Sequence, residues 1–405
     1  MTQLCELKPL TIIGGGVVGL LLAALLADEK ISVVVIEAKK PLLHWDKKSL
    51  DSRVSAINSA SQRLLKIIGI WKEIDLKAYS PLMKLRVWDG LGGAEIIFDS
   101  ADVGSPSLGA IVENREIVRA LWQRLNNDPY VRLVCPEKPL HLLQSDDFIE
   151  LELNNKQKIK TFCVVGADGS HSWLREKMKI ELSERSYKQS AIVAVIRTEN
   201  DHQKTGWQVF LRESIIALLP LADSHTCAIV WSSIAEETDK LMMADERTFK
   251  VELNNAFKFR LGEIRFLNSP KLIPLVMHHA KKYVKPRMVL VGDAAHTIHP
   301  LAGQGVNLGF MDAACLAQCI IDAQREQRDV GSLRVLRRYE RWRKGDNTTM
   351  SAAMRLLKEC FSAQFPFIVQ ARNMGLAIAH RFNFLKNFCM KIAMGEMNDL
   401  PNLMK

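Results

Sequence analysis

A glycine-rich turn between two apolar segments constrains the fold of this chain more than any other feature. Leu10 to Ile13 is a short apolar run, Val17 to Ala27 has the composition of an apolar helix, and Ser32 to Glu37 is rich in β-branched residues. This order of strand, helix and strand predicts a parallel sheet with a helix packed on it. We therefore expect a Rossmann-like α/β unit in this part of the chain.

The glycines of this turn have the spacing that is typical of dinucleotide binding. Gly14 makes the tight turn, Gly16 lets the backbone approach a pyrophosphate, and Gly19 lets the helix pack closely on the strand. Glu37 follows Gly19 by 18 residues, at the end of the second strand, where a carboxylate can accept hydrogen bonds from an adenosine ribose. These features together predict a site for an adenine dinucleotide.

A second loop of unusual composition follows the apolar strand predicted from Met288 to Val291. Asp293 places a carboxylate at the end of this strand, and Pro300 stiffens the loop. Gly303 and Gly305 let a ligand approach the backbone, and a helix is predicted to start near Gly305. A carboxylate beside a helix N-terminus suits a ligand with hydroxyl groups and developing negative charge, such as a flavin with its ribityl chain. The alternative is an ordinary tight turn.

A third segment repeats the pattern of a carboxylate at a strand end. Lys160 to Val165 is predicted to be one strand that leads into Gly166-Ala-Asp-Gly169, so that Asp168 lies at its carboxyl end. Alone, this segment is equally compatible with a simple turn. Its position between the two other motifs favours a binding role.

The hydropathy of the chain argues against a membrane span. Leu10 to Ala27 is 18 residues long with only Thr11 polar, but its helical part has only 11 residues, which is too short to cross a bilayer. No other stretch approaches the required length. We therefore expect no transmembrane segment and a cytoplasmic location.

Charge and cysteine content limit the partners of the chain. The net charge of +10 favours acidic partners such as nucleotide phosphates or anionic lipid, but there is no nucleic-acid motif, and nucleic acid is not expected. The eight cysteines do not form the paired clusters of a zinc site, so no metal is expected. Cys315 and Cys319 are predicted to be buried thiols.

The three motifs together resemble the fingerprints of class A flavin-dependent aromatic monooxygenases. Longer segments resemble the ubiquinone-biosynthesis hydroxylases within that class, and the resemblance runs from Leu10 to Leu403. In detail, the chain looks most like the 2-polyprenylphenol hydroxylase branch. The longer segments are Asp51-Ser-Arg-Val-Ser-Ala-Ile-Asn58, Leu108-Gly-Ala-Ile-Val-Glu-Asn114, His296-Thr-Ile-His-Pro-Leu-Ala-Gly-Gln-Gly-Val-Asn307, Arg337-Arg-Tyr-Glu-Arg341 and Ala393-Met-Gly395.

The resemblance implies a set of residues that contact FAD. They comprise contacts to the pyrophosphate, the adenosine ribose, the ribityl chain and the isoalloxazine ring, and Asp168 would also help to admit NAD(P)H. In chain order they are Gly14, Gly16 and Gly19 (pyrophosphate), Glu37 (ribose), Arg53 (pyrophosphate or flavin edge), Asn114 and Arg119 (a helix facing the cofactor), Asp168 (near the FAD), Gly292, Asp293 (ribityl chain), and Pro300, Gly303, Gln304, Gly305 and Asn307 (isoalloxazine ring).

The resemblance also implies an activity. NAD(P)H would reduce FAD, and the reduced flavin would react with O2 to give a C4a-hydroperoxide that hydroxylates an electron-rich carbon of a polyprenylated phenol. The protein would supply positioning, exclusion of water and electrostatic stabilisation. His296 and His299 are candidates for an acid–base role by location only, and either could instead cap the loop.

The order of the motifs implies an α/β protein with a discontinuous, Rossmann-like FAD-binding domain. We assign residues 1–77, 106–180 and 280–330 to this domain. Residues 78–105 and 181–279 would form a substrate domain with a mixed β-sheet, and residues 331–405 a C-terminal helical region.

Two basic segments near the carboxyl end suggest how an oily substrate reaches the protein. Arg325 to Lys344 contains eight basic and three acidic residues, and Phe382 to Ala393 is apolar with interspersed lysines. One of them could dock on anionic lipid of the inner membrane or on a partner protein of ubiquinone biosynthesis; the alternative is a helix packed on the core. A homo-oligomer is also compatible with the sequence. Other open functions are a different ring hydroxylation, a non-hydroxylating FAD reductase, and an FAD-binding scaffold.

Overall fold

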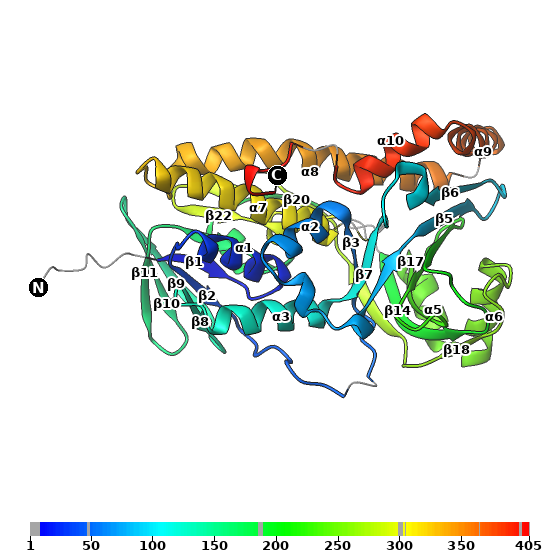
Figure 1. The fold of residues 1–405 in the computed structure, drawn as a ribbon, viewed down its shortest axis with the longest axis horizontal. Helices are drawn as coiled ribbons and strands as arrows, with labels where there is room; N and C mark the ends of the chain where they lie inside the picture. Colours follow the sequence, from blue (N-terminus) through cyan, green and yellow to red (C-terminus); the bar gives the residue numbers. More distant parts are fainter. Residues whose placement is uncertain are drawn as a thin grey trace, which may run out of the picture.

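A parallel sheet and a mostly antiparallel sheet form the two ends of the molecule, and a layer of helices runs along one long edge of both (Figure 1). This computed structural model describes residues 9–46, 49–184, 189–298, 303, 305–363, 365–396 and 399–404.

The parallel sheet contains the strands that precede all three predicted motifs. Its strand order is β21–β22–β12–β1–β2–β8, in which only β21 is antiparallel to its neighbour. Strands β1 and β2 are buried along their whole length, because helices cover the sheet, and this explains their runs of Val and Ile. The six strands are β1 (Leu10–Ile13), β2 (Val33–Ile36), β8 (Val131–Val134), β12 (Val164–Gly166), β21 (Val284–Lys285) and β22 (Met288–Leu290).

The second large sheet has the order β18–β14–β17–β16–β15–β5–β6, and β19 also pairs with β14. Its strands fall within the ranges predicted for the substrate domain. Its strands are β5 (Lys84–Asp89), β6 (Glu95–Asp99), β14 (Gln189–Thr198), β15 (Thr205–Phe210), β16 (Ile215–Pro220), β17 (Thr226–Ile234), β18 (Ile264–Phe266) and β19 (Lys271–Leu275).

Small sheets fill the space around the two large ones. One of them joins the two ends of the molecule, because Ile111 on its strand β7 packs against Val195 and Ala228 of the second large sheet. Their strands are β3 (Val54–Asn58), β7 (Gly109–Glu113) and β4 (Tyr79–Leu82); β9 (Pro139–Gln144), β10 (Ile149–Leu153) and β11 (Lys158–Thr161); and β13 (Leu182–Glu184), β20 (His278–Ala280) and β23 (His296–Thr297).

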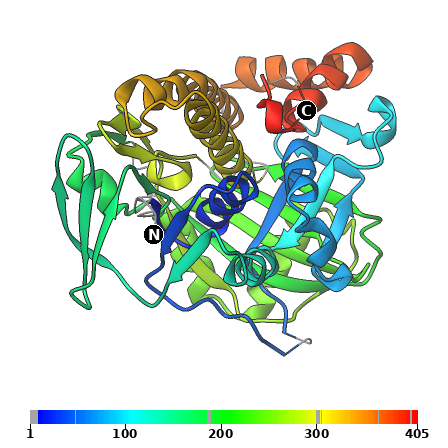
Figure 2. The ribbon, with the colours of Figure 1, turned by 60° about the vertical axis from the view of Figure 1, so that its left-hand side comes forward.

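The helices cover the sheets and form the carboxyl-terminal layer. Helix α1 packs against α7 and α3, and α7 packs against α8 (Figure 2). The helices are α1 (Val17–Asp28), α2 (Ser59–Ile67), α3 (Asn114–Asn126), α4 (Trp173–Lys177), α5 (Ala235–Met243), α6 (Glu246–Ala256), α7 (Gly305–Arg325), α8 (Leu333–Ser362), α9 (Pro366–Arg381) and α10 (Asn383–Ala393), with the short 3-10 helices η1 (Trp71–Glu73), η2 (Leu76–Ala78), η3 (Ser100–Val103), η4 (Gly292–Ala294) and η6 (Asn402–Met404).

Two expectations from the sequence need correction. The predicted strand from Lys160 to Val165 is two strands, because β11 pairs with β10 in a small antiparallel sheet and β12 enters the parallel sheet. Helix α7, which the hydropathy argument did not consider, is long and apolar enough to cross a bilayer. In the structure 89% of the apolar window of α7 is buried, as is typical of a core helix. Cys315 and Cys319 on α7 are buried, as predicted.

A buried carboxylate joins α7 to α8 and to the loop after β22. Asp312 on α7 is fully buried, and its Oδ1 accepts hydrogen bonds from Arg343 Nε (2.8 Å) and Asn347 Nδ2 (3.1 Å). Its Oδ2 accepts from the backbone N–H of Gly292 (3.1 Å) and from His296 Nε2 (2.5 Å). Burial would raise the pKa of Asp312, but His296 and Arg343 outweigh it and hold this pKa well below its usual range. Asp312 is therefore ionised, and His296 Nε2 is the donor.

Replacing this carboxylate should destabilise the fold strongly. The substitution Asp312→Asn leaves the buried Arg343 guanidinium without its main counter-charge, and we expect a loss of about 3 kcal/mol in the free energy of unfolding. Because folding lowers the Asp312 pKa, its contribution is present above the unfolded pKa of about 4 and is lost as pH falls below it. Urea unfolding at several pH values should show a weaker acid-dependent loss in the variant.

The matched control is Asp322→Asn on the same helix, where the carboxylate pairs with Arg338 at the surface. This pair should contribute less than about 1 kcal/mol. Equal losses of stability in the two variants would contradict the role given to Asp312.

Candidate active site

The three predicted motifs follow β1, β12 and β22, and in this chain order they are the first, second and third motif; they meet at one edge of the parallel sheet. Strands β1, β12 and β22 are adjacent and parallel, with Ile13 opposite Gly166 and Gly166 opposite Leu290. Their carboxyl ends therefore lie together, and the chain leaves them through Gly14, Asp168 and Asp293. Ligands of such open sheets bind at this edge.

The glycines after β1 have different structural roles. Gly14 has a φ of +109°, and a Cβ atom there would lie 2.3 Å from the carbonyl oxygen of Ala167. A Cβ atom on Gly19 would lie 2.0 Å from the carbonyl oxygen of Gly14. Gly14 is therefore needed for close backbone packing of the first motif on the second, and Gly19 for close packing of α1 on the end of β1. A Cβ atom on Gly16 would meet no described atom within 4 Å, so this position opens onto space where a diphosphate can lie.

The start of α1 is suited to an anion. Gly16 is its N-cap residue, and the first turn carries no acidic side chain, so the positive end of the helix dipole faces the open space. Beside it, Glu37 accepts hydrogen bonds from the backbone N–H groups of Gly15 (2.6 Å) and Lys39 (2.8 Å). These bonds fix the carboxylate at the end of β2, and its remaining lone pairs can accept from ribose hydroxyls.

Asp168 has one carboxylate oxygen committed to the protein and one that is not. Its Oδ2 accepts from the backbone N–H of Leu174 at the start of α4 (3.1 Å). Its Oδ1 is buried and has no hydrogen-bond partner among the described residues. Burial raises the pKa of this carboxyl group, and hydrogen bonds from Ser172 and Leu174 oppose that rise. An unpartnered buried oxygen at a strand end is compatible with a donor supplied by a ligand.

Sequence reasoning missed the residue that joins the second motif to the third. Arg175 is buried and donates hydrogen bonds to the carbonyl oxygens of Ser170 (2.7 Å) and Ala294 (2.9 Å). His278 Nε2 lies 3.0 Å from the carbonyl oxygen of Asp293. Arg175 and His278 thus hold the backbone around Asp293 in place. The local sequence does not identify either residue, because Ala294 lies 119 residues from Arg175 and Asp293 lies 15 residues from His278.

Asp293 projects from η4 with its side chain exposed, directly after the buried Gly292. Surrounding protein atoms partly desolvate this carboxylate and so raise its pKa, and the charge of Asp312 acts in the same direction. His296 and Arg53 oppose this rise. Arg53 is therefore close enough to Asp293 to interact with it electrostatically, although 240 residues separate them.

The loop before α7 is attached to β3, which follows Arg53. Gly303 has a φ of +63°, and a Cβ atom there would lie 2.8 Å from Ala56 Cβ. Asn307 Nδ2 donates to the carbonyl oxygen of Ala56 (2.8 Å), and its Oδ1 accepts from the N–H of Asn58 (3.0 Å). The Asn307 side chain thus positions the start of α7 on β3, so the amides there are the groups left to face a flavin ring. Gly305, the first residue of α7, has open space where a Cβ atom would lie.

Asn114 and Arg119 are both bonded to protein groups. The backbone N–H of Asn114 donates to the carbonyl oxygen of Arg53 (3.0 Å), and its Oδ1 accepts from Ser55 Oγ (2.6 Å), which holds the approach to β3. The Arg119 guanidinium binds Glu116, Gln123 and the carbonyl oxygen of Glu73. These contacts secure α3 against η1 and leave the predicted FAD contact of Arg119 without support from the geometry.

The remaining predicted residues belong to the sequence of the third motif. His299, Pro300 and Gln304 fall outside the described residues. His296 is buried, with its Nε2 bonded to Asp312, and this geometry favours a positioning role over direct contact with a substrate.

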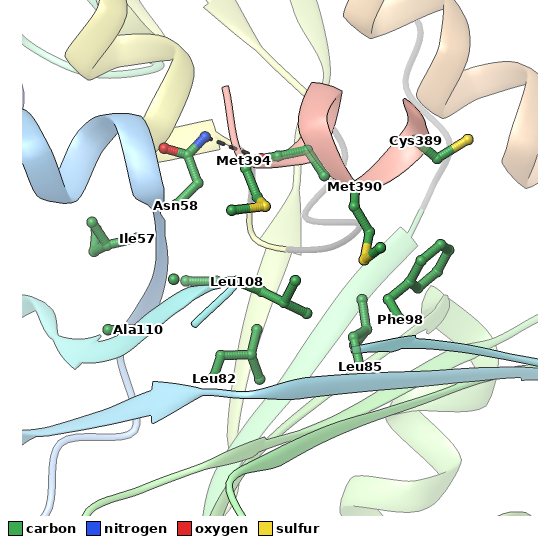
Figure 3. A pocket seen from close by; sticks show the side chains of 13 residues that line it. Ile57, Asn58, Leu82, Leu85, Phe98, Leu108, Ala110, Cys389, Met390 and Met394 are labelled. Carbon is green, nitrogen blue, oxygen red and sulfur yellow. Dashed lines mark hydrogen bonds between the residues drawn. The ribbon is translucent and has the colours of Figure 1, made fainter. Parts of the chain in front are cut away.

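An apolar pocket lies next to β3 and beneath α10 (Figure 3). Its volume is about 110 Å³, close to that of engineered cavities that hold a benzene ring. Asn58 at its edge donates a hydrogen bond to the carbonyl oxygen of Ala393 (3.2 Å), which attaches the end of α10 to β3. None of its lining residues is charged: they are Ala56, Ile57, Asn58, Leu82, Leu85, Phe98, Leu108, Gly109, Ala110, Cys389, Met390, Ala393 and Met394.

The arrangement fits FAD. The open position at Gly16 and the helix N-terminus match a diphosphate, Glu37 matches a ribose, and the exposed Asp293 carboxylate matches the hydroxyls of a ribityl chain. The loop on β3 would then place a flavin ring beside Ala56, at one side of the apolar pocket.

Comparison with known proteins agrees with this geometry. Residues 8–350 match the family model of the FAD binding domain. The chain is 37% identical to 3-demethoxyubiquinol 3-hydroxylase of Escherichia coli, over 95% of this chain and 98% of that protein. It is 35% identical to ubiquinone hydroxylase UbiL of Rhodospirillum rubrum, over 97% and 92% of the two chains. A mitochondrial ubiquinone biosynthesis monooxygenase of Homo sapiens is 32% identical, over 94% and 91%.

The fold is shared with solved flavoprotein structures. The crystal structure of p-nitrophenol 4-monooxygenase from Pseudomonas putida superposes with a TM-score of 0.79 at 18% identity, over 97% of this chain and 99% of that chain. The predicted FAD cofactor, enzyme class and fold class are therefore confirmed. The chain belongs to the FAD-binding-domain family, within the group of flavin-dependent monooxygenases that contains the ubiquinone-biosynthesis hydroxylases.

Proposed function

We propose that this enzyme hydroxylates the aromatic ring of a polyprenylated phenol in ubiquinone biosynthesis, with NAD(P)H and O2 as co-substrates. The observation that carries this proposal is the uncharged pocket beside Ala56, where the loop of the third motif meets β3. Such a pocket suits an apolar ring with a hydrocarbon tail and disfavours a charged aromatic acid, because burying an unpaired charge is costly.

The motifs and the relatives indicate two candidate substrates. The sequence motifs resemble the branch that oxidises 2-polyprenylphenol, which we take as the first candidate substrate. The relative from Escherichia coli is named for hydroxylation of 3-demethoxyubiquinol, and a substrate of this kind is the second candidate. Both are prenylated aromatic rings with hydroxyl groups, and the lining of the pocket is compatible with both.

The protein's own residues would position the reactants and stabilise charge. Bound FAD supplies the electrons taken from NAD(P)H and the reaction with O2. The turn at Gly14 and the start of α1 bind the diphosphate, and Asp293 binds the ribityl chain. The amides at the start of α7 face the flavin ring and stabilise negative charge there. Asp312 and His296 keep that loop in position, and the apolar lining of the pocket excludes water.

Blocking the diphosphate space should remove FAD without unfolding the protein. In Gly16→Asp the new side chain stands at an N-cap, where aspartate stabilises a helix, but its charge and bulk occupy the space proposed for the diphosphate. We expect FAD affinity to fall about 100-fold or more, whereas the melting temperature of the apoprotein should not change. Flavin fluorescence titration of the apoprotein measures the affinity. Gly345→Asp, at another open glycine on α8, is the control and should bind FAD normally; loss of FAD in both variants would refute the assignment.

Narrowing the apolar pocket should weaken binding of the substrate alone. Ala393→Phe places a ring against the pocket lining, and we expect the KM for a prenylphenol to rise about tenfold, because the substrate loses part of its buried contact. FAD content should stay the same. Ala371→Phe adds the same ring at an exposed position of α9 and should leave KM unchanged. An unchanged KM in Ala393→Phe would show that the substrate binds elsewhere.

Product analysis tests the proposed reaction directly. Purified enzyme with FAD, NAD(P)H, labelled O2 and each candidate substrate should give a hydroxylated ring that contains one labelled oxygen. Oxidation of NAD(P)H with saturation of prenyl groups and no labelled product would favour a reductase. Normal quinone production in cells that carry only Gly16→Asp would favour a scaffold, since that variant lacks FAD.

A further inference from the structure

Helix α9 is fixed to the second large sheet through its inner face. Arg372 on α9 is buried and forms a two-pronged ion pair with the buried Asp89 at the end of β5 (2.7 and 3.0 Å). The same guanidinium donates to the carbonyl oxygens of Cys360, Phe361 and Ala363 at the end of α8. Burial would raise the pKa of Asp89, but Arg372 outweighs it and lowers this pKa, so the pair is ionised.

Helix α10 is fixed in the same way. The largely buried Lys386 pairs with Asp102 (2.7 Å), and Asn387 Nδ2 donates to the carbonyl oxygen of Asp102 (3.1 Å). Both helices thus direct polar side chains toward the protein. Buried Met390 on α10 and partly buried Leu376 on α9 accompany these polar side chains on the inner side.

The outer faces of these helices are correspondingly apolar. Phe384 is 85% exposed and Phe367 is 78% exposed. Five of the six exposed phenylalanines in the described part of the chain lie between residues 365 and 388, which indicates an organised surface rather than scattered exposure. We call this surface the aromatic face; it consists of Phe365, Phe367, Met374, Ile378, Phe382, Phe384, Leu385 and Phe388.

The segment that carries the aromatic face has charges of one sign. No Asp or Glu occurs from Phe365 to Gly395. Two of the cations in this segment are the buried, paired Arg372 and Lys386, whereas Arg381 and Lys391 are exposed. Aromatic side chains with exposed cations and no anions match the interface of an anionic bilayer.

The inner side of the same segment leads to the active site. Met390 and Met394 line the apolar pocket from above, opposite Leu85 and Phe98 (Figure 3). Helix α10 therefore has the aromatic face on one side and the proposed substrate pocket on the other. A long prenyl chain bound in the pocket would pass α10 to reach the outside.

We propose that the aromatic face of α9 and α10 docks on the surface of an anionic lipid bilayer and that the prenyl chain of the substrate passes from the bilayer along α10 into the pocket. The substrate part of this proposal rests on the proposed function. The docking part rests on the exposed phenylalanines and the one-sided charge. It makes the enzyme a peripheral membrane protein held at its carboxyl-terminal layer.

Vesicle flotation tests the docking. The FAD-loaded full chain should float with vesicles of phosphatidylethanolamine and phosphatidylglycerol, and more weakly with phosphatidylcholine alone. The double variant Phe367→Ser/Phe384→Ser should lower partitioning about tenfold or more, because two apolar contacts with the bilayer are lost. Phe259→Ser removes an exposed phenylalanine after α6 and serves as the matched control; it should float like the wild type. Failure of the wild type to float, or an equal loss in the control, would overturn the proposal.

A charge variant tests the choice of lipid. Arg381→Glu/Lys391→Glu should abolish the preference for anionic vesicles, and added salt should do the same to the wild type. The other occupant of such a face is a second copy of the chain. A dimer in light scattering that the two serine substitutions dissociate, together with no flotation of the wild type, would assign the face to self-association instead.

Turnover measurements separate this proposal from the proposed function. The serine double variant should hydroxylate a short-chain prenylphenol in solution at the wild-type rate and a long-chain substrate in vesicles about tenfold more slowly. If the variant hydroxylates both substrates at the wild-type rate, the aromatic face has no role in substrate delivery. If the wild type hydroxylates no prenylphenol at all, the proposed function fails, and flotation still decides whether the aromatic face binds lipid.

Discussion

The structure depends on a single ionised carboxylate, Asp312, buried where three parts of the chain meet. It receives hydrogen bonds from Arg343 on α8, from His296, and from the backbone N–H of Gly292. Each bond alone joins two elements; together they hold the strand-end loop, the core helix α7 and the long helix α8 in one arrangement. These bonds fix the backbone on both sides of Asp293 and hold α8 against α7. A buried charge is costly, and it is tolerated here because both carboxylate oxygens of Asp312 accept hydrogen bonds.

The sequence predicted the parts of the site that depend on local geometry. Glycine is required where a strand turns tightly into a packed helix, as at Gly14 and Gly19. Asp168 and Asp293 follow buried strands, and the carboxyl ends of these strands share one edge of the parallel sheet. The parts that depend on distant partners could not be predicted. Arg175 bonds to Ala294, and Arg119 bonds to Glu73, through contacts that only the folded chain creates. The same limit applies to the segment from Lys160 to Val165, which looks like one strand but contributes to β11 and β12 in different sheets.

The carboxyl-terminal helices show why hydropathy alone left two interpretations open. The sequence was compatible with an interfacial helix or with a helix packed on the core. In the structure Arg372 and Lys386 hold the inner face of this segment, and its phenylalanines are exposed. A helix that buries its charges against partners and exposes its rings has an amphipathic pattern that a periodicity analysis cannot orient. Orientation came only from Asp89 and Asp102, which lie far away in the sequence.

The central claim is that three separated stretches of backbone form one site for FAD in each chain. Isothermal titration of FAD into the folded apoprotein tests it most directly. We expect saturation at one FAD per chain, with an added signal of proton exchange that changes with pH because the Asp293 pKa is raised. A folded apoprotein that gives no binding heat and stays colourless after mixing with flavin and gel filtration would contradict it.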